Sequence, residues 1–361
     1  MVPNCEGFLY PVIEKSLCVE CGICEKFCPV LNIVDYNQKK DTEAFAIINN
    51  DENIRFESSS GGVFTAIAKK VIEQNGIVFG VKLDENQVAI HSFTENMEGL
   101  SEFRGSKYVQ SDVGHAFIDC KKFLDDGKAV LFTGTPCQIE GLKRFLRKDY
   151  ENLLCMDIIC HGVPSPKLWK DYVNFQEKKS ASRIVKTAFR RKNDGWKQYS
   201  LSFTFANDSE YCASLYKDPY LQLFLKDVCL RESCYQCSSK KINRISDITV
   251  ADFWGIQNEL PEMDDDKGTS FVLVHTEKGK KIISELQNSK IKQVNSEVGI
   301  KYNPSLIKSV NRPRLRDSFY SDLEKMDFEK LVKKYTNQSF FSKSKNVLKR
   351  AIKKVYKVVF G

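Results

Sequence analysis

Several features are scarce in this sequence, and each absence excludes a class of protein. No stretch approaches eighteen consecutive apolar residues, the length at which a sequence predicts a membrane-spanning helix. The start, Met1 to Asn4, lacks the basic residues and the apolar run of a secretory signal. Full dinucleotide and P-loop fingerprints are also missing. The sequence therefore predicts a cytoplasmic globular protein of one to three domains in its 361 residues.

Acidic residues are missing from one end of the chain. The net charge is +8, yet residues 331–361 hold nine lysines and arginines and no acid, so the other 330 residues sum to −1. A near-neutral body argues against a nucleic-acid partner. From Asn346 onward, apolar residues recur at helical spacing among the basic ones. This pattern predicts either peripheral contact with the inner face of the membrane, or a helix packed on its own domain.

Cysteine, by contrast, is abundant, with 13 residues in a chain without signs of secretion. The strongest motif is the run Cys18, Cys21, Cys24 and Cys28 followed by Pro29. This C-x2-C-x2-C-x3-C-P spacing is typical of bacterial ferredoxins and predicts a 4Fe-4S cluster, whereas structural zinc sites assemble from two separated pairs. In two-cluster ferredoxins the fourth cysteine binds the other cluster. Either Cys28 completes its own cluster, or a first motif is missing upstream.

Beyond the first 40 residues, strands and helices alternate. Strands are expected at 44–49, 77–83, 129–133 and 153–159, and helices at 60–76, 112–125 and 138–147. This order predicts βαβ units and a mostly parallel sheet, so the fold class is α/β. Segments 183–189 and 198–205 alternate like antiparallel strands. The second half is therefore expected to be mixed α+β.

A second set of cysteines follows the expected strands. Cys137 and Cys160 each lie just past a strand, so parallel strands would place both thiols at one carboxyl edge of the sheet, where ligands of open α/β folds bind. Cys234 and Cys237 form a further pair at metal-ligand spacing, preceded by Cys229. These thiols either hold a second cluster or pack in the core.

Small residues before two helices indicate a phosphate-bearing cofactor. The turn 58–62 is Ser-Ser-Ser-Gly-Gly, and residues 133–136 are Thr-Gly-Thr-Pro. At both places backbone amides at a helix start can approach an anion. The alternative is ordinary turn chemistry with capping serines.

Six motifs in order resemble the family of coenzyme F420 hydrogenase/dehydrogenase beta subunits. They are Ser-Ser-Gly-Gly (59–62), Gly-Ser-Lys-Tyr-Val-Gln-Ser (105–111), Gly-Thr-Pro-Cys-Gln (134–138), Cys-His-Gly-Val-Pro-Ser-Pro (160–166), Arg-Glu-Ser-Cys-Tyr-Gln-Cys (231–237) and Ser-Asp-Ile-Thr-Val-Ala-Asp-Phe-Trp-Gly (246–255). The chain is most similar to bacterial members that carry an amino-terminal ferredoxin domain and are often encoded among polysaccharide-biosynthesis genes. Ala251 stands where the family often has glycine.

The resemblance implies FAD and a 4Fe-4S cluster in the main domain, in addition to the amino-terminal cluster. Its implied cluster ligands are Cys137, Cys160, Cys234 and Cys237, with Cys229 as a rival. Its implied flavin contacts are Ser59, Ser60, Gly61, Gly62, Lys107, Tyr108, Gly134 and Thr135. His161 and Lys107 are the candidate catalytic residues. Arg190 and Arg191 either bind an anionic group or form a solvated strand edge.

These expectations define three segments and one function. Residues 1–40 form a ferredoxin-type segment, 41–330 the FAD and 4Fe-4S domain, and 331–361 the basic tail. The implied function is an iron–sulfur flavoprotein oxidoreductase that passes electrons from ferredoxin, or another low-potential donor, to a small-molecule or sugar-type substrate in polysaccharide biosynthesis. The alternative is an electron-transfer beta subunit of a larger complex with no substrate of its own. A homo-oligomer is compatible with either function.

Overall fold

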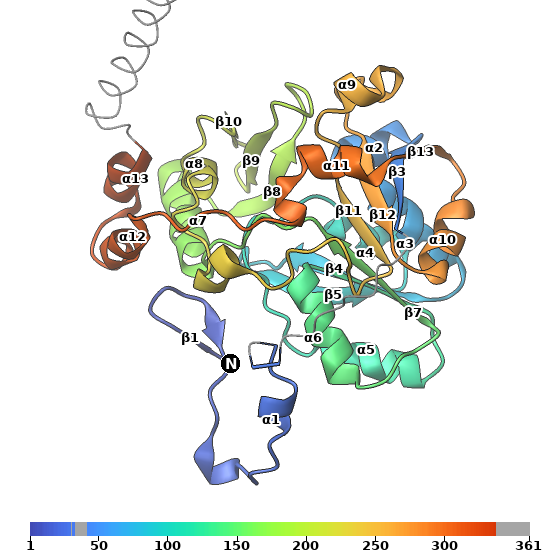
Figure 1. Cartoon of the computed structure of the whole chain (residues 1–361). Coiled ribbons are helices and arrows are strands. Elements are labelled where there is room, and N and C mark those ends of the chain that lie inside the picture. Colours follow the sequence, from blue (N-terminus) through green and yellow to red (C-terminus); the bar gives the residue numbers. More distant parts are fainter. Residues whose placement is uncertain (30, 33–41, 337–361) are drawn as a thin grey trace, which may run out of the picture.

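The computed structural model describes residues 1–29, 31–32 and 42–336. Within these residues the largest element is an eight-stranded mixed sheet (Figure 1). Its strands, in spatial order, are β13 (Ser289–Val294), β3 (Glu43–Asn49), β12 (Ser270–Val274), β11 (Ile248–Asp252), β7 (Leu153–Ile158), β6 (Val130–Gly134), β4 (Ile77–Leu83) and β5 (Ala89–Thr94).

Only the centre of this sheet is parallel. Strands β4, β6, β7 and β11 are parallel neighbours, as the alternation of strands and helices predicts. The flanking strands β5, β12, β3 and β13 pair antiparallel, so the prediction of a mostly parallel sheet is wrong. One reason is local: β4 and β5 are joined by a short turn over residues 84–88, and so short a connection can join only antiparallel strands.

Helices cover both faces of the sheet, because successive strand residues point to opposite sides. On one face α3 (Val63–Glu73), α4 (Met97–Phe103) and α10 (Glu277–Ser284) pack against Val78 and Leu131. On the other face α5 (Ala116–Asp125) and α6 (Pro136–Leu146) pack against Phe79 and Phe132. Beyond them, α9 (Ile256–Glu259) and α11 (Ser296–Tyr302) cover the strands β3 and β12.

A second hydrophobic core lies beside the sheet and is rich in aromatic residues. The strands β8 (Ile184–Arg191), β9 (Ser200–Phe205) and β10 (Glu210–Ser214) form an antiparallel sheet, which confirms the antiparallel pattern read in the sequence. Trp169, Tyr172 and Tyr220 lie in this core. The helices around it are α7 (Pro166–Ser180), α8 (Pro219–Leu225), α12 (Arg316–Leu323) and α13 (Phe328–Thr336). Short elements α2 (Glu52–Glu57), η2 (Glu232–Gln236), η3 (Pro261–Met263) and η4 (Pro304–Leu306) lie in the connections.

The first residues of the amino-terminal segment are anchored to this second core. The elements of the segment are β1 (Val2–Pro3), β2 (Leu9–Tyr10), η1 (Lys15–Leu17) and α1 (Ile23–Lys26). Phe8 is fully buried in the second core, whereas the cysteine run around α1 extends away from the body at the bottom of Figure 1.

The expected start of the basic tail, residue 331, lies within a helix. Helix α13 continues past residue 331 to Thr336, and its Leu331 and Tyr335 are buried against the second core. The amphipathic helix expected from Asn346 lies outside the described residues, as does the expected boundary at residues 40–41. Among the described helices, none combines the length and apolar composition needed to cross a membrane.

Candidate functional site

A cavity of about 560 Å³ lies at the carboxyl ends of the parallel strands β6, β7 and β11. Its floor is aliphatic, with Met156 and Ile158 from β7 and Val250 from β11. Residues from the elements around the second core also line it, among them Arg190 from β8 and Phe224 from α8. This is the edge at which open α/β sheets bind ligands, so the fold places the cavity where the sequence predicted a site.

Most of the predicted cofactor residues surround this cavity. Those that line it are Ser59, Ser60, Gly62, Lys107, Tyr108, Gly134, Thr135, Cys160 and His161. Gly61 does not line it. A Cβ atom at Gly61 would lie 2.3 Å from the carbonyl oxygen of Ile47, so this glycine is needed for close packing on β3.

The turn 58–62 is held rigidly at one side of the cavity. The Ser59 hydroxyl accepts a hydrogen bond from the Ser106 amide at 2.6 Å, and the Ser60 hydroxyl donates to the carbonyl of Thr269 at 2.8 Å. Because Ser60 is so engaged, it does not cap α3 as the sequence predicted. Gly62, with a φ of 82°, precedes the helix without any side-chain cap. The first amides of α3 thus remain available at the cavity wall.

Lys107 contributes its side chain to the cavity lining but directs its ammonium group to α4. Its Nζ donates to the carbonyls of Glu102 and Arg104, at 2.8 and 2.9 Å. A lysine that satisfies the last carbonyls of a helix has a structural role. Burial lowers the pKa of Lys107 to about 7, and the nearby Glu102 carboxylate partly opposes this shift. The geometry therefore gives Lys107 a capping contact that the sequence analysis did not foresee.

Replacing Lys107 by methionine should change how stability depends on pH. Between pH 7 and 10 an unfolded chain keeps the lysine protonated, whereas the folded chain releases the proton, so the Lys107 contribution makes stability rise with pH in this window. Lys107→Met removes that rise. Urea unfolding at several pH values measures it. Parallel stability profiles for the two proteins would contradict the lowered pKa.

His161 lies between the cavity and a carboxylate. Its Nε2 is 2.6 Å from Oδ1 of Asp227, and its ring meets the Phe224 ring edge-on at 5.2 Å between centroids. The carboxylate fixes the orientation of the imidazole at the cavity wall. This geometry is compatible with the predicted proton donor and equally with a positioning role beside Cys160.

Four cysteines from three segments lie together beside the cavity, and we call them the cysteine quartet. They are Cys137 in the first turn of α6, Cys160 after β7, Cys234 in η2 and Cys237 directly after it. Burial raises the pKa of the Cys160 thiol, and the other three thiols raise it further. Burial also raises the pKa of Cys234 to about 11, again with contributions from Cys137 and Cys237. The four sulfurs are therefore close enough to interact.

Two further observations concern the quartet. No group of three or more His, Cys, Asp or Glu side chains in the described ranges is placed to hold a single metal ion. In a 4Fe-4S cluster each thiolate binds a different iron, so its ligands are spread more widely than those of one ion.

Lys240 lies against the quartet, with its Nζ donating to the carbonyls of Cys160 and, at 2.9 Å, Ser305. Its positive charge can offset part of the charge of four thiolates.

The other cysteines are placed differently. Cys18, Cys21 and Cys24 of the amino-terminal run are exposed, and Cys28 is half-buried. Cys229, the rival ligand, is fully buried in the second core among its aromatic residues. Burial raises the pKa of the Cys229 thiol, and no quartet cysteine contributes to that shift. Its surroundings are those of a packing residue.

Arg190 is the functional candidate whose environment the sequence did not reveal. Its guanidinium is buried, its Nη1 donates to Oδ2 of Asp252, and its Cζ lies 4.4 Å from the centre of the Tyr199 ring. The expected solvated strand edge describes only its neighbour Arg191, which pairs with Glu210 at 2.9 Å on the surface. Trp254 also lines the cavity, and its ring stacks on that of Trp196 with 4.8 Å between the centroids.

Comparisons with known proteins bear on this site. Residues 127–298 match the family described as the carboxyl-terminal part of the beta subunit of coenzyme F420 hydrogenase/dehydrogenase. The chain is 24% identical over 185 residues to a subunit of the F(420)H(2) dehydrogenase of Methanosarcina mazei, a match that covers 49% of this chain. It spans about half the length of that relative, 51%.

A solved structure shares the fold. It is that of the F420-reducing [NiFe] hydrogenase complex from Methanosarcina barkeri, with a TM-score of 0.51 and 15% identity over 76% of this chain and 93% of the other. The names of both relatives are those of oxidoreductases. The resemblance read from the sequence motifs is therefore confirmed: residues 127–298 are similar to the family of coenzyme F420 hydrogenase/dehydrogenase beta subunits.

Proposed function

We propose that the chain is an iron–sulfur flavoprotein that transfers electrons as a subunit of a hydrogenase/dehydrogenase-type complex. One observation carries this proposal: Cys160 belongs both to the cysteine quartet and to the lining of the cavity. A group bound by the quartet would lie next to a ligand in the cavity. A flavin accepts one or two electrons, so it can couple single-electron carriers to a two-electron reaction.

The cavity has the chemistry expected of a flavin site. The aromatic rings of Tyr108, Tyr199, Phe224 and Trp254 line it, which suits a flat ring system. The uncapped start of α3 and the turn before it offer amides and hydroxyls to phosphate groups. Both kinds of wall occur in one cavity, and together they support FAD as its ligand.

The amino-terminal segment supports an electron-transfer role. Three of the four cysteines in its run are exposed, and the adjacent Leu17 and Val19 are 79% and 82% exposed. Exposed ligands and apolar neighbours suit an electron donor or partner subunit that docks transiently. Because the similar proteins are named as part of a dehydrogenase and part of a hydrogenase complex, they favour the role of a subunit over that of a reductase with its own sugar-type substrate.

Anaerobic reconstitution of the full chain with iron, sulfide and FAD tests the proposal. We expect about eight irons and one bound flavin per chain, with the broad sulfur-to-iron absorption of the clusters beneath the flavin bands. Reduction by a low-potential donor should bleach both the clusters and the flavin. A content of about four irons per chain would show that only one of the two proposed clusters forms. Failure to retain flavin would contradict the flavoprotein assignment.

A further inference from the structure

The feature that carries a further inference is the guanidinium of Arg190, which uses only part of its hydrogen-bonding capacity. The residue is 7% exposed, and its Nη1 is paired with Asp252. Within the described part of the chain, its Nε and Nη2 are buried without a hydrogen-bond partner. Buried donors are nearly always satisfied, so two orphaned donors on one side chain require an explanation.

The two orphaned donors form one edge of the guanidinium. The Nε–H and Nη2–H bonds point in the same direction, and this pair matches two oxygens of a phosphate or a carboxylate. The opposite edge is fixed, because Asp252 also accepts from Nε1 of Trp196 at 2.9 Å. Arg190 thus presents a rigid fork rather than a mobile charge.

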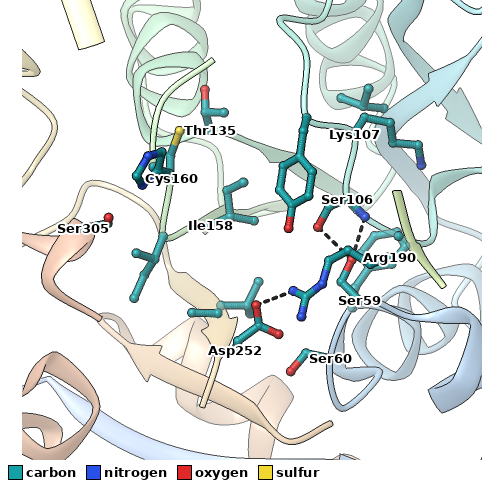
Figure 2. Close-up of a pocket in the computed structure, with 18 of the residues that line it drawn as sticks. Ser59, Ser60, Ser106, Lys107, Thr135, Ile158, Cys160, Arg190, Asp252 and Ser305 are labelled. Carbon is teal, nitrogen blue, oxygen red and sulfur yellow. Dashed lines mark hydrogen bonds and ion pairs between the residues drawn. The ribbon is translucent and has the colours of Figure 1, made fainter. Parts of the chain in front are cut away.

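The fork lies among other groups that favour an anion. Figure 2 shows Arg190 beside Ser59 and Ser60, and these serines belong to the turn that precedes the uncapped helix α3. Lys192, two residues along the chain, fixes the turn by donating to the Ser60 carbonyl at 2.8 Å. A charged fork, hydroxyls and free helix amides therefore share one wall of the cavity.

The two sides of the cavity carry different kinds of side chain. In Figure 2 Cys160 and Thr135 lie on one side, while Arg190, Ser59 and Ser60 lie on the other. Aromatic side chains that line the cavity include Tyr199 and Trp254, whose rings also contact Arg190 at 4.4 and 5.5 Å. A ligand with an aromatic ring and a phosphate group would satisfy both walls.

We propose that the free edge of Arg190 binds a phosphate group of the flavin, with the turn 58–62 and the first amides of α3 as further contacts. This inference rests on the proposed function, because it names the flavin as the ligand. It adds an orientation: the phosphates lie at Arg190, and the isoalloxazine ring extends toward Cys160. Arg190 then selects phosphorylated flavins over riboflavin.

The experiment compares FAD with riboflavin, which has no phosphate. For Arg190→Gln we expect the dissociation constant for FAD to rise about 10- to 100-fold, the range for a lost bidentate hydrogen bond to a charged group, while the riboflavin constant stays unchanged. Quenching of flavin fluorescence measures both constants. Arg191→Gln, on the exposed side of the same strand, is the matched control and should retain both affinities.

The outcomes separate this inference from the proposed function. Equal losses for FAD and riboflavin, or no loss for either, would overturn the role of Arg190. If Arg190→Gln fails to fold, competition by inorganic pyrophosphate on the unaltered chain replaces it: displacement of FAD but not riboflavin supports the phosphate site, and failure to displace FAD overturns it. If the unaltered chain binds neither flavin, the proposed function fails. A direct measurement of pyrophosphate binding then tests whether Arg190 and the turn 58–62 bind phosphate groups at all. That part of the inference stands only if the chain binds pyrophosphate.

Discussion

Replacing Cys160 by alanine is expected to remove about four irons from the reconstituted protein and to leave about four, because each 4Fe-4S cluster depends on four thiolates. Cys160 is the quartet member that also lines the cavity, so its loss should interrupt electron transfer between the remaining cluster and the flavin. Flavin binding itself should persist, since the phosphate wall lies on the other side of the cavity. Iron and sulfide analysis, together with flavin absorbance after anaerobic reconstitution, measures both effects.

Two variants sharpen this prediction. Cys21→Ala should remove the other four irons, because it belongs to the amino-terminal run. Cys229→Ala is the matched control: this thiol is buried in the second core, and its replacement should leave the iron content unchanged. A loss of iron from Cys229→Ala, with full iron in Cys160→Ala, would show that Cys229 is the ligand and that the quartet is assigned incorrectly.

The sequence could predict the convergence of Cys137 and Cys160, because that convergence follows from a local rule. Two parallel strands with a helix between them must end at the same edge, and β6 and β7 do pair in parallel, with Gly134 opposite Asp157. The approach of Cys234 and Cys237 follows no such rule. They come from η2 and the residue after it, far along the chain. Their spacing suggested metal ligands, but no local rule placed them beside Cys137 and Cys160.

The environment of Arg190 could not be predicted from the sequence. Regular alternation along a strand would bury only one of Phe189 and Arg190, yet both are buried, and the pairing of β8 with β9 shifts register between Ala188 and Arg191. Alternation also does not say which face meets a cavity. That depends on how the second core packs against the main sheet, which is a tertiary property. Likewise, the sequence places Lys107 directly before Tyr108, but it does not show that the ammonium group of Lys107 binds carbonyls at the end of α4.

Replacing Arg316 by methionine is expected to lower the free energy of unfolding by about 3–5 kcal/mol, the range for breaking a buried ion pair by removing one partner. Arg316 is 2% exposed. Its Nη1 and Nη2 donate to the two carboxylate oxygens of Glu6 at 2.7 and 2.6 Å, and its Nε donates to the carbonyl of Leu230 at 3.1 Å. Methionine is of similar volume, so the loss reports the ion pair rather than a cavity.

The variant should also loosen the amino-terminal segment, because Glu6 and Phe8 anchor that segment to the body. Chemical denaturation measures the stability, and limited trypsin digestion at Lys15 and Lys26 measures the release of the segment. Arg312→Met is the matched control: its ion pairs with Glu232 and Asp317 lie on the surface, so it should cost at most about 1 kcal/mol. Adding Glu6→Gln to Arg316→Met should restore part of the stability, since it removes the charge left unpaired. If Arg316→Met were no more destabilised or digested than Arg312→Met, the ion pair would not be the anchor, and burial of Phe8 together with contacts such as the Arg231 hydrogen bond to the Leu9 carbonyl would hold the segment.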